Sequence, residues 1–370
     1  MKPAVLILAP GVAALTLVTA CGGSGPGSGS PAPTVDVSAC VAKAEQVVNA
    51  AKAPATLTVG TPFQIQPLAG KTIWFVAQSM ANANDAQTWS GIQAAAKASG
   101  INAKLFDGQG TTTAQNQGVA EAVAQHAAGI DMFGIPPSTV SGPLLQAQQA
   151  GIPVISGPQY PPAPGVTGYT TSNYSGAGTE MAAYGAAING CKVDAVAFYS
   201  NLYLNLSQMV NSATAEFQQL CPNTCKLTAD DINVGTIATQ AGPATSSALR
   251  RDPSVNFLIA TFDPVAIFMV PAVQQAKSNA KLVGQGGNPA NLTYIRSGQV
   301  QVADWAFPSQ TILGWASFDQ LVRSMLKLPA STEDENVALQ LLDKSNLDTA
   351  GTFPAFANLA AVYEHSWGLS

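Results

Sequence analysis

Residues 71–100 read KTIWFVAQSMANANDAQTWSGIQAAAKASG, and this stretch sets the pattern for most of the chain. An apolar run, Thr72–Ala77, is followed by a helical segment, Ala86–Ser99, that ends at Gly100. A short apolar run without alternation is typical of a strand buried on both faces of a parallel sheet. Glycine is the preferred left-handed residue at the end of a helix. The stretch therefore predicts one strand–helix unit.

The same unit recurs along the chain, first up to a proline-rich bend at 159–164 and then again after it. Before the bend, further strands are expected at Ala103–Phe106, Ile130–Ile135 and Pro153–Ser156, and helices at Thr113–Ala128 and Val140–Ala150, ending at Gly129 and Gly151. After the bend, strands are expected at Asp194–Ser200, Asp231–Val234, Phe257–Thr261, Lys281–Gly284 and Val300–Trp305. Helices are expected there at Ser175–Asn189, Leu206–Leu220, Ala244–Arg251, Pro264–Ser278 and Gln310–Leu326. Repeated units with short loops predict an α/β fold of two doubly wound parallel-sheet lobes. Ligands bind such sheets at the carboxyl ends of the strands, and two lobes can close on a small molecule across a hinge.

The composition narrows the functional classes. The chain has 370 residues, is 47% hydrophobic and only 10% charged, and has a formal net charge of −5. This length is sufficient for two domains that each bury their own core. The high apolar content excludes disorder for most of the chain. The slight acidity, with no run of Lys and Arg, argues against nucleic-acid binding.

The amino terminus reads as a targeting segment. Residues 1–20 combine Lys2, a short apolar run and small residues before Cys21, as in a cleaved signal peptide. Leu17–Cys21 resembles a bacterial lipobox, which implies acylation of the Cys21 sulfur. An ordinary secretory signal with a chance cysteine is the alternative. Residues 21–35 form a Gly/Ser/Pro tether, and residues 36–69 an N-terminal helix and lead-in. We therefore expect an exported protein on the outer face of the cell membrane, held there through its lipid anchor only.

Four cysteines remain after Cys21, an even number suited to an oxidising compartment. Three pairings are possible. Cys221 and Cys225 bracket a short turn, which favours Cys221–Cys225 together with Cys40–Cys191. The two histidines, His126 and His365, have no metal-like spacing, so no metal site or cofactor is expected.

Several motifs together resemble type I periplasmic binding proteins, the ribose- and galactose-binding receptors of ABC importers. They are the unit at 71–100, the Ala-Gly-Ile-Pro-Val stretch at 150–154, Ser172-Asn173 with Gly176, the strand end at 260–263, and the segments 282–289 and 295–300. The resemblance implies a hinge of three crossovers. It assigns 70–170 plus 308–350 to an N-lobe and 171–307 plus 351–370 to a C-lobe.

The resemblance also indicates candidate ligand-binding residues, with departures from the sugar-binding pattern. Charged positions of the family are replaced by uncharged ones, such as Gln159, Asn211, Gly286 and Ala306. The predicted ligand-binding set is Asn82, Asp85, Trp89, Asp107, Gln109, Gln159, Asn173, Tyr199, Asn211, Phe262, Asp263 and Trp305. This pocket is less charged than one for a free sugar, so the expected ligand is small, neutral and not necessarily a simple aldose.

Several of these residues also have a purely structural interpretation. Asp263 precedes Pro264 and is suited to capping a helix. Asp107 begins a Gly-Gln-Gly loop that turn chemistry alone explains. Trp89 and Trp305 are residue types that more often belong to a core, although Trp305 ends a strand at a lobe boundary, where a ring can stack on a ligand.

No enzymatic motif is complete. The glycines at 176 and 178 are followed by Met181 where a dinucleotide fingerprint requires glycine, and no phosphate loop or nucleophile elbow is present. We expect a monomeric solute-binding lipoprotein, not an enzyme, that delivers its ligand to an ABC transporter permease. The alternatives are a ligand-sensing subunit for a membrane kinase or chemoreceptor, and a binding protein for a more apolar, non-sugar metabolite.

Overall fold

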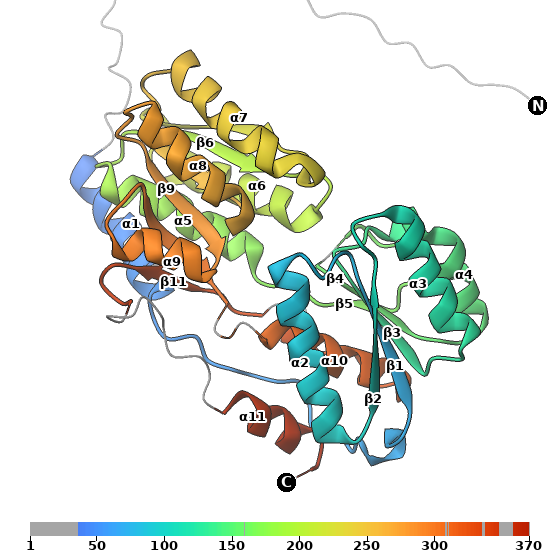
Figure 1. The fold of residues 1–370 in the computed structure, drawn as a ribbon. Helices are drawn as coiled ribbons and strands as arrows, with labels where there is room; N and C mark the ends of the chain where they lie inside the picture. Colours follow the sequence, from blue (N-terminus) through green and yellow to red (C-terminus); the bar gives the residue numbers. More distant parts are fainter. Residues whose placement is uncertain are drawn as a thin grey trace, which may run out of the picture. The chain divides into compact units, whose positions relative to one another are not determined.

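The computed structural model describes residues 36–158, 160–307, 309, 311–334, 337–347 and 358–369. The predicted signal peptide, the acylation site at Cys21 and the tether up to residue 35 lie outside the described residues, as does Gln159. Within the described residues the chain forms two sheets of five and six strands, each covered by helices (Figure 1). The predicted fold class is confirmed.

The first lobe contains a sheet in the order β2-β1-β3-β4-β5, in which all strand pairs are parallel. Its strands are β1 (Thr72–Ala77), β2 (Asn102–Asp107), β3 (Gly129–Phe133), β4 (Val154–Gly157) and β5 (Gly168–Tyr169). Its helices are α2 (Ala83–Ser99), α3 (Thr112–Ala124), α4 (Ser141–Gln149), α10 (Ile312–Met325) and α11 (Leu359–Ser366), with single 3-10 turns at Gln66–Leu68 and Pro137–Val140. Helices α2 and α10 pack together on one face of the sheet, and α3 and α4 pack on the other (Figure 1).

The second lobe contains a sheet in the order β11-β10-β9-β8-β6-β7, parallel except for β11. Its strands are β6 (Val193–Tyr199), β7 (Cys225–Asp231), β8 (Phe257–Ala260), β9 (Lys281–Gly286), β10 (Gln301–Ala306) and β11 (Gln340–Asp343). Its helices are α1 (Val37–Ala51), α5 (Tyr174–Ile188), α6 (Leu204–Leu220), α7 (Ile237–Arg251), α8 (Asp263–Gln275) and α9 (Pro289–Arg296), with a 3-10 turn at Val234–Thr236. Helices α1, α5 and α6 pack together, and α7 packs on α8.

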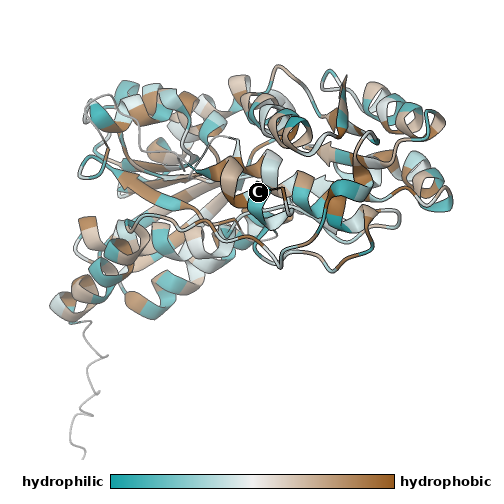
Figure 2. Ribbon diagram, turned by 90° about the horizontal axis from the view of Figure 1, so that it is seen from below, coloured by the Kyte–Doolittle hydropathy of each residue, from teal (hydrophilic) through white to brown (hydrophobic). Residues whose placement is uncertain are grey.

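Each sheet separates two apolar cores. In the first lobe, Ile73 and Phe75 face α2 and α10, whereas Trp74 and Val76 face α3 and α4. Both sets of side chains are buried, as the unbroken apolar run Thr72–Ala77 predicts. The helices carry apolar residues on one face and polar residues on the other, so that teal and brown segments alternate along them in Figure 2.

Three links join the two sheets, as expected for the predicted hinge: residues 170–173, the segment from 307 to 311, and the segment from 326 to 339. Two of them are hydrogen-bonded to each other. The amide of Val337 donates to the carbonyl of Thr171 (3.0 Å), and the amide of Asn173 donates to the carbonyl of Val337 (3.1 Å). Two of the three links therefore lie side by side, at residues 171–173 and Val337.

Two local expectations are wrong. The strand expected at 231–234 lies at 225–231, where Val193 pairs with Cys225 in parallel register. This edge strand alternates polar and apolar residues because one of its faces is exposed, so a search for continuous apolar runs misses it. Gly129 is the first residue of β3 and not the end of a helix, since α3 stops at Ala124.

The assignment of the carboxyl-terminal segments is also corrected. Residues 340–343 were expected in the N-lobe, but β11 pairs antiparallel with β10 in the second sheet. Residues 359–367 were expected in the C-lobe, but Tyr363 and Trp367 stack on Trp315 of α10 in the first lobe, with ring centroids 5.6 Å apart in each case. Burial of large aromatic surface decides the second placement, and pairing of an open sheet edge decides the first.

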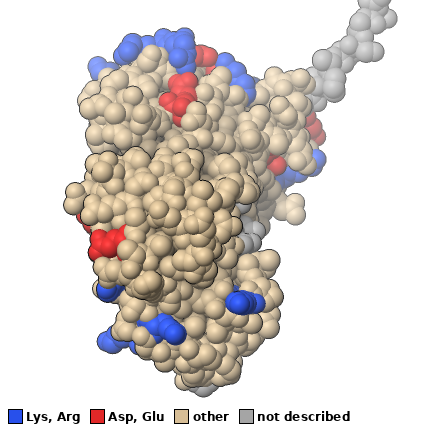
Figure 3. All heavy atoms as spheres, turned by 90° about the vertical axis from the view of Figure 1, so that its right-hand side faces the viewer, with Lys and Arg blue, Asp and Glu red and all other residues tan. Residues whose placement is uncertain are grey.

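The surface carries few charges. Figure 3 shows one face on which uncharged residues predominate and the Lys and Arg side chains lie mainly toward its two ends. None of the described helices is long and apolar enough to cross a membrane. In the described part of the chain, no group of three or more His, Cys, Asp or Glu residues is arranged to hold a metal ion.

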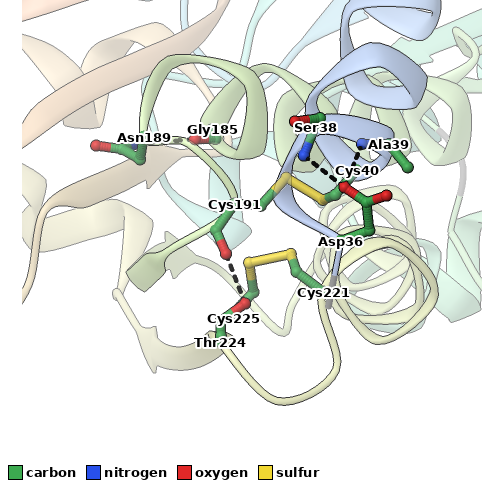
Figure 4. The surroundings of a disulfide bond; sticks show 10 residues. All are labelled: Asp36, Ser38, Ala39, Cys40, Gly185, Asn189, Cys191, Cys221, Thr224 and Cys225. Atoms are coloured by element: carbon green, nitrogen blue, oxygen red, sulfur yellow. Dashed lines mark hydrogen bonds between the residues drawn. A yellow bond between two sulfur atoms is a disulfide. The ribbon is translucent and has the colours of Figure 1, made fainter. Parts of the chain in front are cut away.

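Both favoured disulfides are confirmed, and they lie close together where the second sheet begins (Figure 4). Cys40 of α1 is bonded to Cys191, which lies two residues before β6. Cys221 directly follows α6 and is bonded to Cys225, the first residue of β7. The Thr224 hydroxyl donates to the Cys191 carbonyl (2.6 Å) and links the two bridges. The first bridge attaches α1 to the second lobe.

The two bridges should differ in their contribution to stability. Cys40–Cys191 spans 151 residues, whereas Cys221–Cys225 spans only 4. Chain entropy predicts a loss of roughly 5 kcal/mol in the free energy of unfolding for the C40A/C191A variant and roughly 2 kcal/mol for C221A/C225A. Urea denaturation monitored by circular dichroism measures both losses. Equal losses would contradict the entropic account.

Candidate functional site

The first lobe gathers polar groups where β1 and β2 end. Asp107, the last residue of β2, accepts hydrogen bonds from the amides of Met80 (3.0 Å) and Gln109 (2.9 Å) through its Oδ1. Its carboxylate therefore shapes the loop that follows β1, which agrees with the structural interpretation of Asp107. Gln78, directly after β1, donates its amide to the Phe133 carbonyl (2.9 Å) and is fixed against β3.

Asp85 lies beneath this loop in the first turn of α2 and is fully buried. Its Oδ2 accepts a hydrogen bond from the Ser79 amide (2.8 Å), whereas its Oδ1 has no hydrogen-bond partner among the described residues. Burial raises the pKa of Asp85 to about 7, against the opposing effect of the Ser79 and Gln78 amides and with a further increase from Asp107. Asp85 is therefore a carboxylic acid over most of the acidic pH range.

Tyr203 is the residue of the second lobe that lies near Asp85 and Gln78. It precedes α6, is buried, and its ring centroid lies 5.6 Å from that of Tyr160 in the first lobe. Burial raises the pKa of Tyr203, a hydrogen bond with the Gln78 side chain lowers it, and the nearby Asp85 raises it. Gln78, Asp85, Tyr160 and Tyr203 thus form one cluster with contributions from both lobes, which we call the interlobe cluster. Within the described residues, no Lys or Arg belongs to it.

Three members of the interlobe cluster are absent from the predicted set: Gln78, Tyr160 and Tyr203. Gln78 lies directly after β1, and Tyr160 lies in the loop after β4. The carboxyl ends of strands are the positions that this fold favours for ligand contacts. Tyr203 could have been found as the aromatic residue in the loop after β6. Of the four residues of the interlobe cluster, only Asp85 was predicted from the sequence.

Two asparagines of α6, Asn211 and Asn205, differ in their burial. Asn211 was predicted, but it is exposed. Asn205, in the first turn of the same helix, is 2% exposed, and its side chain interacts with Tyr174 at the start of α5. The Oδ1 of Asn205 has no hydrogen-bond partner within the described residues. Asn205 is therefore the buried amide near the start of α6, and the contact of Asn211 with a ligand stays a prediction.

Asp263 lies buried in the second lobe, between the carboxyl ends of β8, β9 and β10. It is the first residue of α8, is fully buried, and accepts a hydrogen bond from the Asn288 amide (2.7 Å). Asp304 accepts one from the Gly287 amide (2.9 Å). A Cβ atom on Gly284 would lie 2.7 Å from Asp263 Oδ1 and 2.9 Å from Asp304 Oδ2, so only glycine fits between the two carboxyl groups.

Burial and the neighbouring Asp304 raise the pKa of Asp263 well above its usual range. Two carboxyl groups this close together cannot both be ionised without a large cost, so the pair shares a proton. This geometry makes Asp263 a residue that positions the 286–288 loop. It does not present its carboxyl group at the surface. The expectation that Asp263 caps the helix is wrong, because Phe262 occupies the cap position of α8 and the Asp263 carboxyl group accepts from the amide of Asn288 instead.

Two predicted aromatic residues belong to the cores. Trp305 is fully buried, donates from Nε1 to Glu180 Oε2 (2.6 Å), and packs edge-on against Tyr184. Successive strand residues point to opposite faces, so Asp304 and not Trp305 faces Asp263. Trp89 stacks on Phe75 with ring centroids 5.7 Å apart. Trp305 therefore has the core role that is the commoner one for its residue type, whereas Trp89 is half-buried and its contact with a ligand stays a prediction.

The remaining predicted residues lie at the ends of helices and strands. Asn82 accepts a hydrogen bond from the Asn84 amide (3.0 Å) and caps α2, and Asn173 accepts one from the Gly176 amide (2.9 Å) and caps α5 at the hinge. Gln109 is exposed in the loop after β2. Tyr199 and Phe262 are half-buried at the carboxyl ends of β6 and β8. Their contact with a ligand stays a prediction.

The raised pKa of Asp85 predicts a pH dependence of stability. Between pH 3.8 and about 7 the folded state retains a proton that the unfolded state has lost, so the free energy of unfolding falls as the pH rises through this window. The Asp85→Asn variant should lack this decrease, which amounts to about 4 kcal/mol in the free energy of unfolding over the whole window. The variant should therefore be more stable than the wild type at about pH 8. Denaturation curves from pH 4 to about pH 8 measure it.

Asp131 provides the matched control. It is buried in β3, and burial likewise raises its pKa to about 7. It lies beside Ser317 of α10 and makes no hydrogen bond to a residue of the interlobe cluster. Asp131→Asn should change the pH dependence in the same direction and leave ligand affinity unchanged. A pH dependence unaltered by Asp85→Asn would show that Asp85 is already ionised below pH 7.

Comparison with known proteins agrees with this geometry. The model of the periplasmic binding protein domain family matches residues 73–326. No curated protein matches the sequence. Among solved structures, a glucose-galactose binding protein from Geobacillus stearothermophilus is similar, with 18% identity and a TM-score of 0.67 over 75% of this chain and 99% of that one.

Two further structures have the same fold. A carbohydrate transporter protein from Acidothermus cellulolyticus 11B in complex with myo-inositol is 22% identical, with a TM-score of 0.61 over 81% of this chain and 100% of that one. An ABC transporter solute-binding protein from Mycobacterium smegmatis with bound glycerol is 17% identical, with a TM-score of 0.66 over 75% of this chain and 96% of that one. The family consists of solute-binding proteins, which confirms the expectation that the chain is not an enzyme. The chain belongs to the periplasmic binding protein family and is an extracytoplasmic solute-binding protein.

Proposed function

We propose that this chain is a lipoprotein, anchored through Cys21, that captures a small neutral ligand bearing several hydroxyl groups and delivers it to the permease of an ABC importer. The observation that carries the proposal is the interlobe cluster. Gln78 and Asp85 of the first lobe meet Tyr203 of the second, and no basic side chain belongs to the cluster. Similar proteins hold myo-inositol, glycerol, allitol and D-allose.

The chemistry of the interlobe cluster supports a neutral, hydroxyl-bearing ligand. Tyrosine hydroxyls and a carboxylic acid both donate and accept hydrogen bonds, as a ligand hydroxyl does. The Oδ1 of Asp85 is buried without a donor among the described residues, so a ligand hydroxyl that donates to it would relieve an unsatisfied group. An anionic ligand would lack a basic partner here and would lie beside acidic groups.

The hinge supports capture by closure. Contacts such as that between Tyr203 and Gln78 join groups from two lobes, so they exist only when the lobes are close together. A ligand that touches both sides binds the closed state more tightly and shifts the population toward it. The paired hinge segments around Thr171 and Val337 are suited to such a motion, because a few residues in extended conformation absorb the rotation.

Removal of the Tyr203 hydroxyl group tests the proposal. Neutral sugars, polyols and neutral aromatic metabolites are first screened by thermal shift, and one ligand per chain is expected to raise the melting temperature. Tyr203→Phe should then weaken that ligand roughly three- to tenfold, the effect of one neutral hydrogen bond, as measured by isothermal titration calorimetry.

Tyr294→Phe is the matched control, because Tyr294 lies on α9 and belongs to a different core of the second lobe. It should leave the affinity unchanged. Equal affinities of the two variants would remove Tyr203 from the site. A screen in which no neutral compound raises the melting temperature would contradict the proposed ligand class.

A further inference from the structure

Exposed basic side chains gather at the edge of the second lobe where the strands begin and the helices end. Lys192 directly precedes β6, Lys226 is the second residue of β7, and Lys281 opens β9. Further basic residues lie at helix ends on this edge: Arg250 and Arg251 close α7, and Lys277 follows α8. We call these six residues the basic edge. Figure 3 shows Lys and Arg side chains along the top of the molecule, where this lobe lies.

Only part of this positive charge is neutralised within the lobe. Lys226 pairs with Asp194 (2.7 Å) and Asp252 (3.0 Å), and Arg251 pairs with Asp230 (3.6 Å). In the part of the chain that the structure describes, no ion pair involves the other four residues, Lys192, Arg250, Lys277 and Lys281. The edge is therefore positive on a chain whose formal net charge is −5.

The ends of helices explain a part of this pattern, since Lys and Arg are favoured near a helix carboxyl terminus. The first lobe shows the same preference with Lys97 at the end of α2 and Lys327 after α10. Helix ends do not explain the lysines at the start of β6, β7 and β9. The basic edge thus holds more positive charge than helix ends alone require.

The chain also enters the fold at this edge. Asp36 caps the start of α1, and the nearby Cys40 is bonded to Cys191, the neighbour of Lys192 (Figure 4). The disulfide fixes the start of α1 at the amino ends of the strands. The segment from Cys21 to residue 35 leads to this point, and 15 residues can span at most about 50 Å. An anchored chain therefore holds the basic edge near the membrane surface.

We propose that the basic edge docks on the anionic headgroups of a phospholipid membrane and so orients the anchored protein. This inference rests on the proposed anchoring through Cys21. Acyl chains would supply the attachment, and the basic edge would supply the orientation. The attraction of basic residues to anionic headgroups acts only within about a Debye length, roughly 8 Å at physiological salt, so the edge must approach the surface closely.

The proposed orientation has a functional consequence. The amino and carboxyl ends of parallel strands lie at opposite edges of a sheet. When the basic edge rests on the membrane, the carboxyl edge of the second sheet, with Tyr199 and Phe262, points away from it. In the docked orientation, the proposed ligand-binding edge would therefore stay accessible to a ligand from solution.

Vesicle binding without the anchor tests the proposal. A chain that begins at Gly22 retains the tether and lacks Cys21, and every contact described above lies within residues 36–369, so its fold is preserved. It is sedimented with vesicles of phosphatidylcholine and phosphatidylglycerol, or of phosphatidylcholine alone. We expect binding to the anionic vesicles only, and loss of that binding at high salt.

Two triple variants with the same change in net charge locate the surface. Lys192→Gln, Lys277→Gln and Lys281→Gln together should weaken binding to anionic vesicles at least about tenfold. Lys71→Gln, Lys97→Gln and Lys327→Gln, all exposed in the first lobe, should weaken it far less. Both variants should bind ligand like the wild type, so a failure of the proposed function appears separately, in the thermal-shift screen.

Three outcomes overturn the proposal. The first is equal binding to neutral and anionic vesicles, and the second is no binding to either. The third is equal weakening by the two triple variants, which would indicate an effect of net charge alone. The second outcome would be expected if the basic edge instead met an acidic surface of the permease.

Discussion

Parallel pairing of the strands places the carboxyl ends of each sheet at one edge and the amino ends at the other. In the first lobe this brings the loops after β1, β2 and β4 together around Asp85, and in the second it brings the loops after β6, β8 and β9 together. The same pairing collects the starts of β6, β7 and β9 at the opposite edge, where Lys192, Lys226 and Lys281 lie. Both the proposed ligand site and the proposed membrane-facing edge follow from this one constraint.

The few charged residues of the chain are distributed unevenly between the two edges of the sheets. Acidic groups such as Asp85 and Asp263 are buried at the carboxyl edges without basic partners, where desolvation keeps a proton on them. Basic groups collect at the amino edge of the second lobe and remain exposed. A chain with only 16 Lys and Arg therefore has an interlobe cluster without basic residues and one edge where basic residues outnumber their acidic partners.

Much of the fold could be predicted from local patterns, because buried parallel strands are continuous apolar runs. Thr72–Ala77 was expected as a strand with these bounds, and both disulfides were among the favoured pairings. The edge strand β7 was misplaced because its polar alternation lacks that signal. The ends of the chain were misassigned because β11 and α11 depend on long-range contacts, with β10 and with Trp315, that no local pattern encodes.

The site could be predicted only in part, for a related reason. The pattern of strand ends led to the sheet edges where Asp85 and Asp263 lie, but a shift along one element changes which side chain is presented. One position separates Trp305 from Asp304, and nearly two helical turns separate Asn211 from Asn205. Tyr203 was missed because its partners Gln78 and Tyr160 come from the other lobe. Such a contact is visible only in three dimensions.

The central claim is that buried, proton-bearing acids without basic partners select a neutral solute. Native mass spectrometry of the protein, purified gently from its own cells, tests this claim most directly. The account predicts a complex with one small neutral molecule per chain, rich in hydroxyl groups once released and identified. A released ligand that carries a phosphate, a carboxylate or an ammonium group would contradict it.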